Sequence, residues 1–254
     1  MSDRGPIKLY CFPHAGAGVS SFGRWPSAIG SAASSTPVLL PGRDGRRREK
    51  RIVDRRVLLA DLLRRYGRPT EEPYGIYGHS LGGLIAYTVA RAAHRAGLPR
   101  PAFVAVGACP PPDVGARLTD ACELPDDELL DVLAGFGALP PDAPRGGVWQ
   151  RVALDVIRDD LRLARALRAD ADGPLDVPLL VLSGRDDPLA GPDVMAGWRD
   201  WGTRTVVERT LPGDHFFVRG RELPRLLGRA CRVAQRTQPL AHQVNRRTDV
   251  EDRR

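Results

Sequence analysis

The sequence predicts an α/β fold: a mostly parallel sheet flanked by helices, with a helical insertion over one end of the sheet. Short apolar runs alternate with segments of helical periodicity along most of the chain. This alternation stops over residues 110–171 and then resumes. The 254 residues, 42% hydrophobic and 27% charged, have the composition of an ordinary globular domain.

The apolar runs and the helical patterns give the expected elements in order. Strands are expected at residues 7–12, 37–40, 74–77, 102–106, 177–182 and 205–211. Helices are expected at 20–33, 53–66, 81–96, 192–201 and 222–234. We therefore expect one domain over residues 1–234. Residues 235–254 lack apolar periodicity and are expected to form a disordered tail.

The interruption at residues 110–171 holds two helical patterns, at 125–136 and 148–167, between stretches rich in proline and glycine. Such a long segment just past a strand end is typical of a lid over a binding site. Its apolar positions would then face the ligand below (Leu129, Leu130, Leu133, Val156, Leu163 and Leu167).

Composition also bears on compartment and partners. No apolar stretch is long enough to span a membrane, and the first residues do not resemble a signal peptide. Four scattered cysteines without a CxxC pair predict a reduced, cytoplasmic protein with no metal site. The net charge of +7 includes a basic cluster at residues 43–56 without interleaved aromatics. It is either a solvated face or a docking surface for an acidic protein, and nucleic acid is not expected to bind.

The segment Gly78-His79-Ser80-Leu81-Gly82 fits the G-x-S-x-G pattern between an expected strand and an expected helix. This context is typical of the nucleophile elbow of α/β-hydrolases, in which flanking glycines relieve crowding around a strained serine. A serine that merely caps a helix would not explain both glycines. We predict that Ser80 is a catalytic nucleophile.

A serine nucleophile needs a base, and five histidines are available. His215 follows the last expected strand, where its loop would lie over the carboxyl edge of the sheet. The acid should lie between nucleophile and base in the chain, just after strand 177–182. Both Asp186 and Asp187 qualify, and the spacing from Gly184 favours Asp187.

Two backbone N–H groups should stabilise the oxyanion of the tetrahedral intermediate. The N–H of Leu81 is the first candidate. The second is expected in the loop after the first strand, 13–18, where small residues allow close approach and Ala15 N–H is the candidate. This loop lacks the third glycine of a dinucleotide fingerprint, so a nucleotide cofactor is not expected there.

These motifs together resemble those of type II thioesterases, which are stand-alone α/β-hydrolases of polyketide synthase and nonribosomal peptide synthetase pathways. The resemblance covers about residues 7–234 and is carried by five segments: FPHAG at 12–16, PGR at 41–43, GHSLGG at 78–83, GxxDP at 184–188 and GDHFF at 213–217. RDDL at 158–161 in the insertion also fits. Ala17 stands where the family usually has glycine, and Asp214 stands where glycine or another small residue is common; neither departure removes a reactive group.

The resemblance implies hydrolysis of acyl groups from the phosphopantetheine thiol of acyl or peptidyl carrier proteins, by a monomer without metal or other cofactor. Three alternatives remain. A carboxylesterase or lipase would use the same triad on oxygen esters. A macrocyclising thioesterase would normally be fused to a carrier domain, and a non-catalytic binding module would not need the triad.

Overall fold

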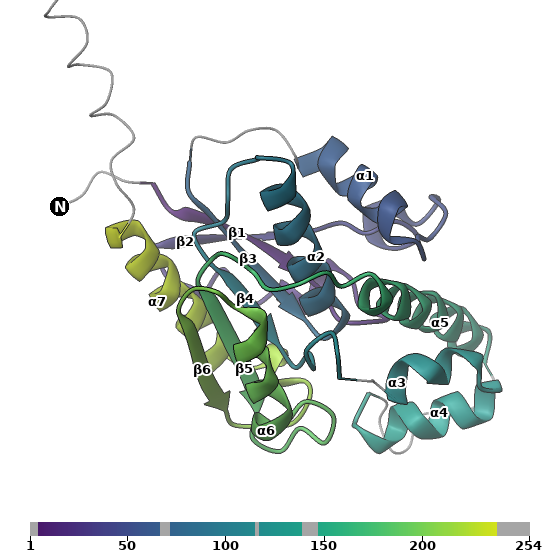
Figure 1. Ribbon diagram of the computed structural model, residues 1–254. Coiled ribbons are helices and arrows are strands. Elements are labelled where there is room, and N and C mark those ends of the chain that lie inside the picture. The colour runs from purple at the N-terminus through teal and green to yellow at the C-terminus, as the bar shows by residue number, and fades with distance from the viewer. Residues whose placement is uncertain (1–4, 67–71, 115–116, 139–146, 238–254) are drawn as a thin grey trace, which may run out of the picture.

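The computed structural model describes residues 5–66, 72–114, 117–138 and 147–237, whose strands form a six-stranded sheet (Figure 1). Neighbouring strands are all parallel, in the order β2-β1-β3-β4-β5-β6. The strands are β1 (Ile7–Phe12), β2 (Ala33–Pro37), β3 (Tyr74–His79), β4 (Val104–Gly107), β5 (Leu179–Gly184) and β6 (Val206–Leu211). The helices are α1 (Arg55–Tyr66), α2 (Leu81–Arg95), α3 (Arg117–Asp120), α4 (Asp126–Gly135), α5 (Val148–Ala169), α6 (Pro192–Met195) and α7 (Glu222–Thr237).

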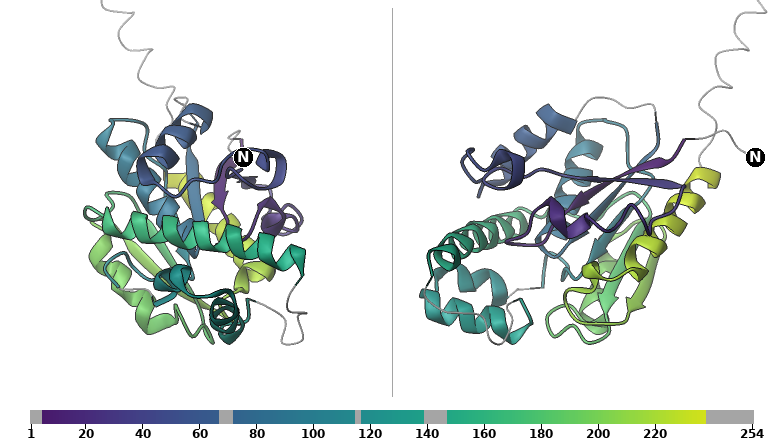
Figure 2. Two further views of the ribbon diagram at one scale, coloured as in Figure 1. Left: turned by 90° about the vertical axis from the view of Figure 1, so that its right-hand side faces the viewer. Right: turned by 180° about the vertical axis from the view of Figure 1, so that it is seen from behind.

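Helices cover both faces of the sheet, as parallel crossover connections require. On one face, Leu58 of α1 and Ile85 of α2 belong to a buried cluster with strand residues. On the other face, Leu227 of α7 packs with Trp25 in a second cluster. The two views in Figure 2 show α7 on the side of the sheet away from α1 and α2. The inner strands β4 and β5 therefore read as near-continuous apolar runs, because both of their faces are buried.

The segment predicted as an insertion contains α3, α4 and α5, which lie together beyond one end of the sheet (Figure 1). Leu129 and Leu133 of α4 pack against Leu154 and Leu161 of α5 in a small core of their own. Leu167, further along α5, packs in the main core instead. Helix α5 therefore joins the insertion to the body of the protein.

The predicted helix at residues 20–33 is wrong. The chain forms a short 3-10 helix, Val19–Phe22, followed by turns. Phe22, Trp25 and Ile29 have helical spacing and are all buried, but successive turns bury them, with Trp25 Nε1 donating to the carbonyl of Val218. Pro26 lacks the N–H that a continuous helix would use there.

The strand predicted at 37–40 lies four residues earlier, at Ala33–Pro37. It is an edge strand, and its small polar residues pair with β1 alone. Val38 and Leu40 are buried in the core after the strand has ended, so their apolar character reflects packing and not pairing in the sheet.

Helix α7 extends three residues into the predicted tail, and residues 238–254 of that tail lie outside the described residues. In the parts of the chain that the structure describes, no helix is long and apolar enough to cross a membrane.

Candidate active site

Ser80 lies in the turn between β3 and α2, the strand–turn–helix context that the sequence predicts. Its φ of 54° and ψ of −117° are strained for a residue with a side chain. The two glycines of the motif are sterically required. A Cβ at Gly78 would lie 1.8 Å from the carbonyl oxygen of Gly82, and a Cβ at Gly82 would lie 2.1 Å from that of Phe12. Close packing of α2 against β1 and β3 thus holds the turn.

His215 and Asp187 meet at the same edge of the sheet, after β6 and β5. Nδ1 of His215 lies 2.9 Å from Oδ2 of Asp187, and both side chains are buried. Gly184 allows the two loops to touch, because a Cβ there would lie 2.5 Å from the Asp214 carbonyl oxygen. Asp186 is exposed, so the structure pairs the histidine with Asp187, the aspartate that the spacing favours.

The Asp187 carboxylate is held in its charged form. Burial raises its pKa, but the hydrogen bond and charge of His215, with N–H groups of Leu189 and Ala190 at 2.9 and 3.0 Å from Oδ1, lower it overall. A charged carboxylate accepts from Nδ1–H and leaves Nε2 of His215 free to accept a proton. This arrangement would allow His215 to act as a general base oriented by Asp187.

Ser80 and His215 both line two cavities, of about 150 and 280 Å³. Ala15 also lines both, and Leu81 lines the larger one, so the two predicted oxyanion donors belong to residues beside the serine. The insertion supplies Leu118 and Leu161 to both cavities. A substrate carbonyl at Ser80 would thus have space on two sides, under the helices of the insertion.

The apolar positions expected to face a ligand divide into two groups. Leu133 lines the smaller cavity, together with Ile157 and Leu161. The other predicted leucines pack inside the insertion or in the main core: Leu129, Leu130, Leu163 and Leu167. Periodicity identified the apolar faces of the helices, but it could not separate residues that line the cavities from residues that pack between helices.

His79 has a supporting role that the sequence does not reveal. It is fully buried, with Nδ1 at 2.7 Å from the Tyr77 hydroxyl and Nε2 at 2.8 Å from the backbone carbonyl of His215. Burial holds its pKa well below the usual value, with the charges of His14 and His215 acting in the same direction. The neutral ring can therefore accept from Tyr77 and donate to the loop that carries His215.

Two other groups near Ser80 are not suited to nucleophilic or basic roles at neutral pH. Burial lowers the pKa of His14 to about 3, and the buried Nδ1 of its ring has no hydrogen-bond partner among the residues that the structure describes. Burial raises the pKa of Cys109 to about 11. His94 lies at the end of α2, and His242 lies outside the described residues.

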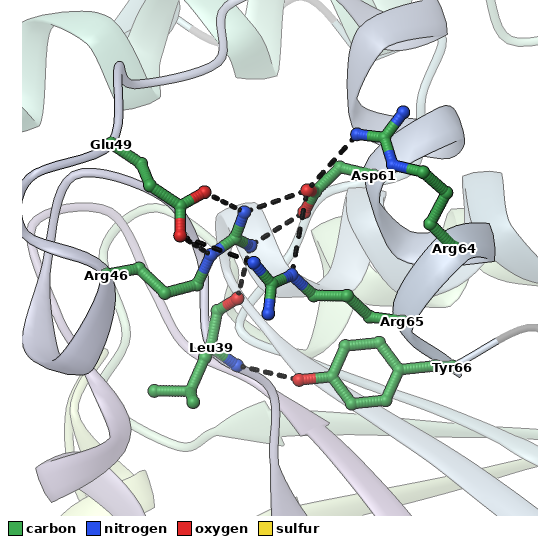
Figure 3. Close-up of polar contacts among 7 residues, drawn as sticks. All are labelled: Leu39, Arg46, Glu49, Asp61, Arg64, Arg65 and Tyr66. Atoms are coloured by element: carbon green, nitrogen blue, oxygen red, sulfur yellow. Dashed lines mark hydrogen bonds and ion pairs between the residues drawn. The ribbon is translucent and has the colours of Figure 1, made fainter.

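The basic cluster at residues 43–56 is not uniformly exposed. Arg46 is buried and lies between Asp61 and Glu49, with hydrogen bonds of 2.7 and 2.8 Å to the Asp61 carboxylate and one of 3.0 Å to the Leu39 carbonyl (Figure 3). Its hydrogen bonds lower the pKa of Asp61. Arg46 therefore belongs to the interior and not to a docking surface, whereas Arg47 and Arg48 are exposed.

Comparisons with known proteins identify the family of this chain. Residues 7–231 match the family model described as thioesterase domain. The gramicidin S biosynthesis protein GrsT of Aneurinibacillus migulanus is 24% identical over 212 residues, which cover 84% of this chain and 83% of GrsT. The RedJ thioesterase from the prodiginine biosynthetic pathway in Streptomyces coelicolor is 34% identical, with a TM-score of 0.78, over 89% of this chain and 90% of RedJ.

The type II thioesterase BorB from the borrelidin biosynthetic cluster is 26% identical, with a TM-score of 0.73, over 89% of this chain and 92% of BorB. The resemblance to type II thioesterases that the motifs predict is therefore confirmed. The family match extends from β1 into α7 and includes the whole sheet. The chain belongs to the thioesterase domain family, and it is an α/β-hydrolase that acts on thioesters.

Proposed function

We propose that this protein releases acyl groups from the phosphopantetheine thiol of acyl or peptidyl carrier proteins in polyketide or nonribosomal peptide biosynthesis. Ser80 is the proposed nucleophile, His215 the base and Asp187 the acid that orients it. The backbone N–H groups of Leu81 and Ala15 are the proposed oxyanion donors. One observation carries the proposal: Ser80 lines the same two cavities as His215, and His215 is paired with the buried Asp187.

The proposed reaction has two steps with one acyl-enzyme between them. Ser80 Oγ attacks the thioester carbonyl carbon while Nε2 of His215 takes its proton, and the oxyanion forms opposite the N–H groups. The C–S bond then breaks, and the histidine returns the proton to the leaving thiolate. In the second step, water attacks the acyl-serine with the same base, which releases a carboxylic acid and restores Ser80. These steps use only groups of the chain, so we propose no metal or other cofactor.

The two cavities suggest where the two parts of a carrier-bound substrate would bind. The larger one, about 280 Å³, is lined mainly by apolar residues such as Leu84 and Ala164, which suits an acyl chain. The smaller one includes the exposed Arg219 beside His14, which suits the amide-rich phosphopantetheine arm. In this arrangement residues 110–171 act as the lid. The shape of the cavity under the lid then determines which acyl chains the enzyme prefers.

The partner and compartment follow from the same proposal. GrsT, RedJ and BorB carry names that place them in biosynthetic pathways of this kind. We propose a carrier protein as the partner, with no role for nucleic acid or membrane, and a monomer as the working unit. All four cysteines are free, in keeping with the cytoplasmic location that we propose.

A direct comparison of substrates tests the function. An acyl carrier protein loaded with hexanoyl phosphopantetheine and p-nitrophenyl hexanoate present the same acyl group to the purified protein. We expect kcat/KM to be at least tenfold higher on the carrier thioester. A preference for the oxygen ester would instead identify a general carboxylesterase, and no turnover of either would contradict the proposal.

A further inference from the structure

Asp160 is a buried acidic residue on α5, 2% exposed, where that helix meets the loop after β1. Its Oδ2 accepts a hydrogen bond of 2.7 Å from the backbone N–H of Gly16. Both carboxylate oxygens accept from Arg43, at 2.8 Å from Nη1 and 2.5 Å from Nη2. A buried carboxylate with three donors in this geometry is a fixed point in the structure.

Arg43 holds the other side of the same loop. Its Nη1 also donates to the carbonyl oxygen of Ala17, at 2.9 Å. The N–H of Gly16 and the C=O of Ala17 are therefore both bound, one to the carboxylate and one to the guanidinium. Gly16 has a φ of 77°, and a Cβ there would lie 2.7 Å from Cγ1 of Ile157 on α5. The backbone of the loop thus lies directly against the helix.

This contact bears on the proposed oxyanion donor one residue earlier. The N–H of Gly16 belongs to the planar peptide group between Ala15 and Gly16, so Asp160 fixes the orientation of that plane. The preceding peptide, which carries the N–H of Ala15, is joined to it through a single Cα. Without the carboxylate, Gly16 could adopt other backbone conformations at little cost, and the Ala15 N–H would turn with it.

We propose that Asp160, together with Arg43, is a positioning residue that holds the Ala15 N–H toward the oxyanion. The inference rests on the proposed function of this site. Helix α5 then has two roles, because Leu161 lines both cavities while the preceding residue holds the loop. The same rigid helix sets the shape of the acyl space and the position of the donor.

The neighbouring Asp159 provides a matched control. It lies on the same helix and pairs with Arg51 at 2.6 Å and with Arg162 at 3.1 Å, and its side chain is 21% exposed. Neither of these two ion pairs involves the loop after β1. Asp159→Ala therefore removes a link between α5 and the segment that contains Arg43, but it leaves the Asp160 contacts in place.

The test compares Asp160→Asn, Asp160→Ala and Asp159→Ala with the unmodified protein on an acyl-N-acetylcysteamine thioester, well below each thermal midpoint. An alkyl boronic acid reports the tetrahedral state, and an acyl-pantetheine amide reports ground-state binding. For Asp160→Ala we expect kcat/KM to fall about 10- to 100-fold, mostly through kcat, and the boronate Ki to rise by a similar factor. The amide Kd should change less than threefold. The kcat/KM of Asp160→Asn should lie between those of Asp160→Ala and the unmodified protein, because the amide oxygen of asparagine can still accept the hydrogen bond from Gly16.

The positioning role is wrong if Asp160→Ala keeps kcat/KM within threefold, if Asp159→Ala loses as much, or if the amide Kd weakens as much as the boronate Ki. Failure of the proposed function would give a different result: the unmodified protein would itself not hydrolyse the thioester. The two failures can therefore be distinguished.

Discussion

Ser80 combines a strained backbone with glycines that cannot be replaced without a clash. Strain of this kind costs about 1–3 kcal/mol and persists only where surrounding packing enforces it. Here the packing comes from α2 against β1 and β3, as the contacts of Gly78 and Gly82 show. The position of the serine is thus set by the backbone, and we expect that its side chain can be removed without disturbing the fold.

Removing the proposed catalytic side chains should separate activity from folding. Ser80→Ala should abolish thioester hydrolysis while the thermal midpoint stays within a few degrees. His215→Ala should lower kcat on the order of 10⁴-fold, and Asp187→Asn somewhat less, because it disturbs the orientation of the base. Steady-state kinetics would measure the activity of each variant, and circular dichroism would measure its thermal midpoint. Activity of Ser80→Ala within tenfold of the unmodified protein would show that the nucleophile is another group.

Two histidines whose pKa values are lowered in the folded protein, His14 and His79, should make the fold sensitive to acid. Burial lowers the pKa of His14 to about 3, and the charges of His215, Arg219 and Arg43 add to this, whereas an unfolded chain titrates near 6.5. Between these values the unfolded state binds more protons, so the free energy of unfolding falls as the pH falls, by up to about 1.4 kcal/mol per unit. The lowered pKa of His79 acts with the same sign.

His14→Gln should therefore lose less stability than the unmodified protein on acidification. Between pH 6.5 and 5 the difference should be about 1.6 kcal/mol, measured by urea unfolding at each pH. Equal losses for the two proteins would mean that His14 is not held neutral in the folded state.

Among the elements, α5 connects the insertion to the main body. Its residues divide among the insertion core, the main core and the cavities, and Ala164 is buried and lines the larger cavity. A larger side chain at that position would extend into space that we assign to the acyl chain. A change of this kind tests the role of the helix without removing a contact.

Ala164→Leu should narrow the acyl preference. We expect kcat/KM for an octanoyl thioester to fall about tenfold or more, and that for an acetyl thioester to change less than threefold. Ala153→Leu is the control, because Ala153 is exposed on the same helix. If octanoyl and acetyl substrates were affected equally, the larger cavity would not be the acyl site.

Over the whole molecule, the count of 38 basic residues overstates the free positive surface, because some of them are paired with carboxylates. Asp61 accepts from Arg46 and also lies near Arg64 and Arg65, at 3.6 and 3.7 Å (Figure 3). The Arg46–Asp61 part of this network is buried, so breaking it leaves an uncompensated carboxylate. Arg46→Ala should therefore lower the free energy of unfolding by about 3 kcal/mol, as chemical denaturation would measure. A loss below 1 kcal/mol would mean that Arg64 and Arg65 compensate.

A docking role, if present, belongs to the exposed part of the cluster. Reversing Arg47 and Arg48 to Glu should slow turnover of carrier-bound thioesters and weaken its dependence on salt, because acidic partners are attracted over about a Debye length. Turnover of N-acetylcysteamine thioesters should not change. The control reverses Arg229 and Arg232, which are exposed on α7 on the other side of the sheet and give the same change in charge. Equal effects of the two reversals would indicate a general influence of net charge.

The sequence by itself determined the class of fold, most strands and helices, and the positions of Ser80, Asp187 and His215. These features are local: a strand buried on both faces is an apolar run, and a turn that needs glycine contains glycine. The order of such segments along the chain then restricts the topology of a parallel sheet. The role of each site residue remains a prediction until it is measured.

Only the tertiary structure shows which residues contact one another in the interior. Phe22, Trp25 and Ile29 have helical spacing, yet turns bury them, because burial selects for apolar character and not for one backbone conformation. Arg46 looks identical to its exposed neighbours in sequence, and Asp160 looks identical to Asp159. What distinguishes them is a partner far away along the chain: Asp61 in one case, and Gly16 with Arg43 in the other. Contacts over such separations depend on how the layers pack, and no local pattern records them.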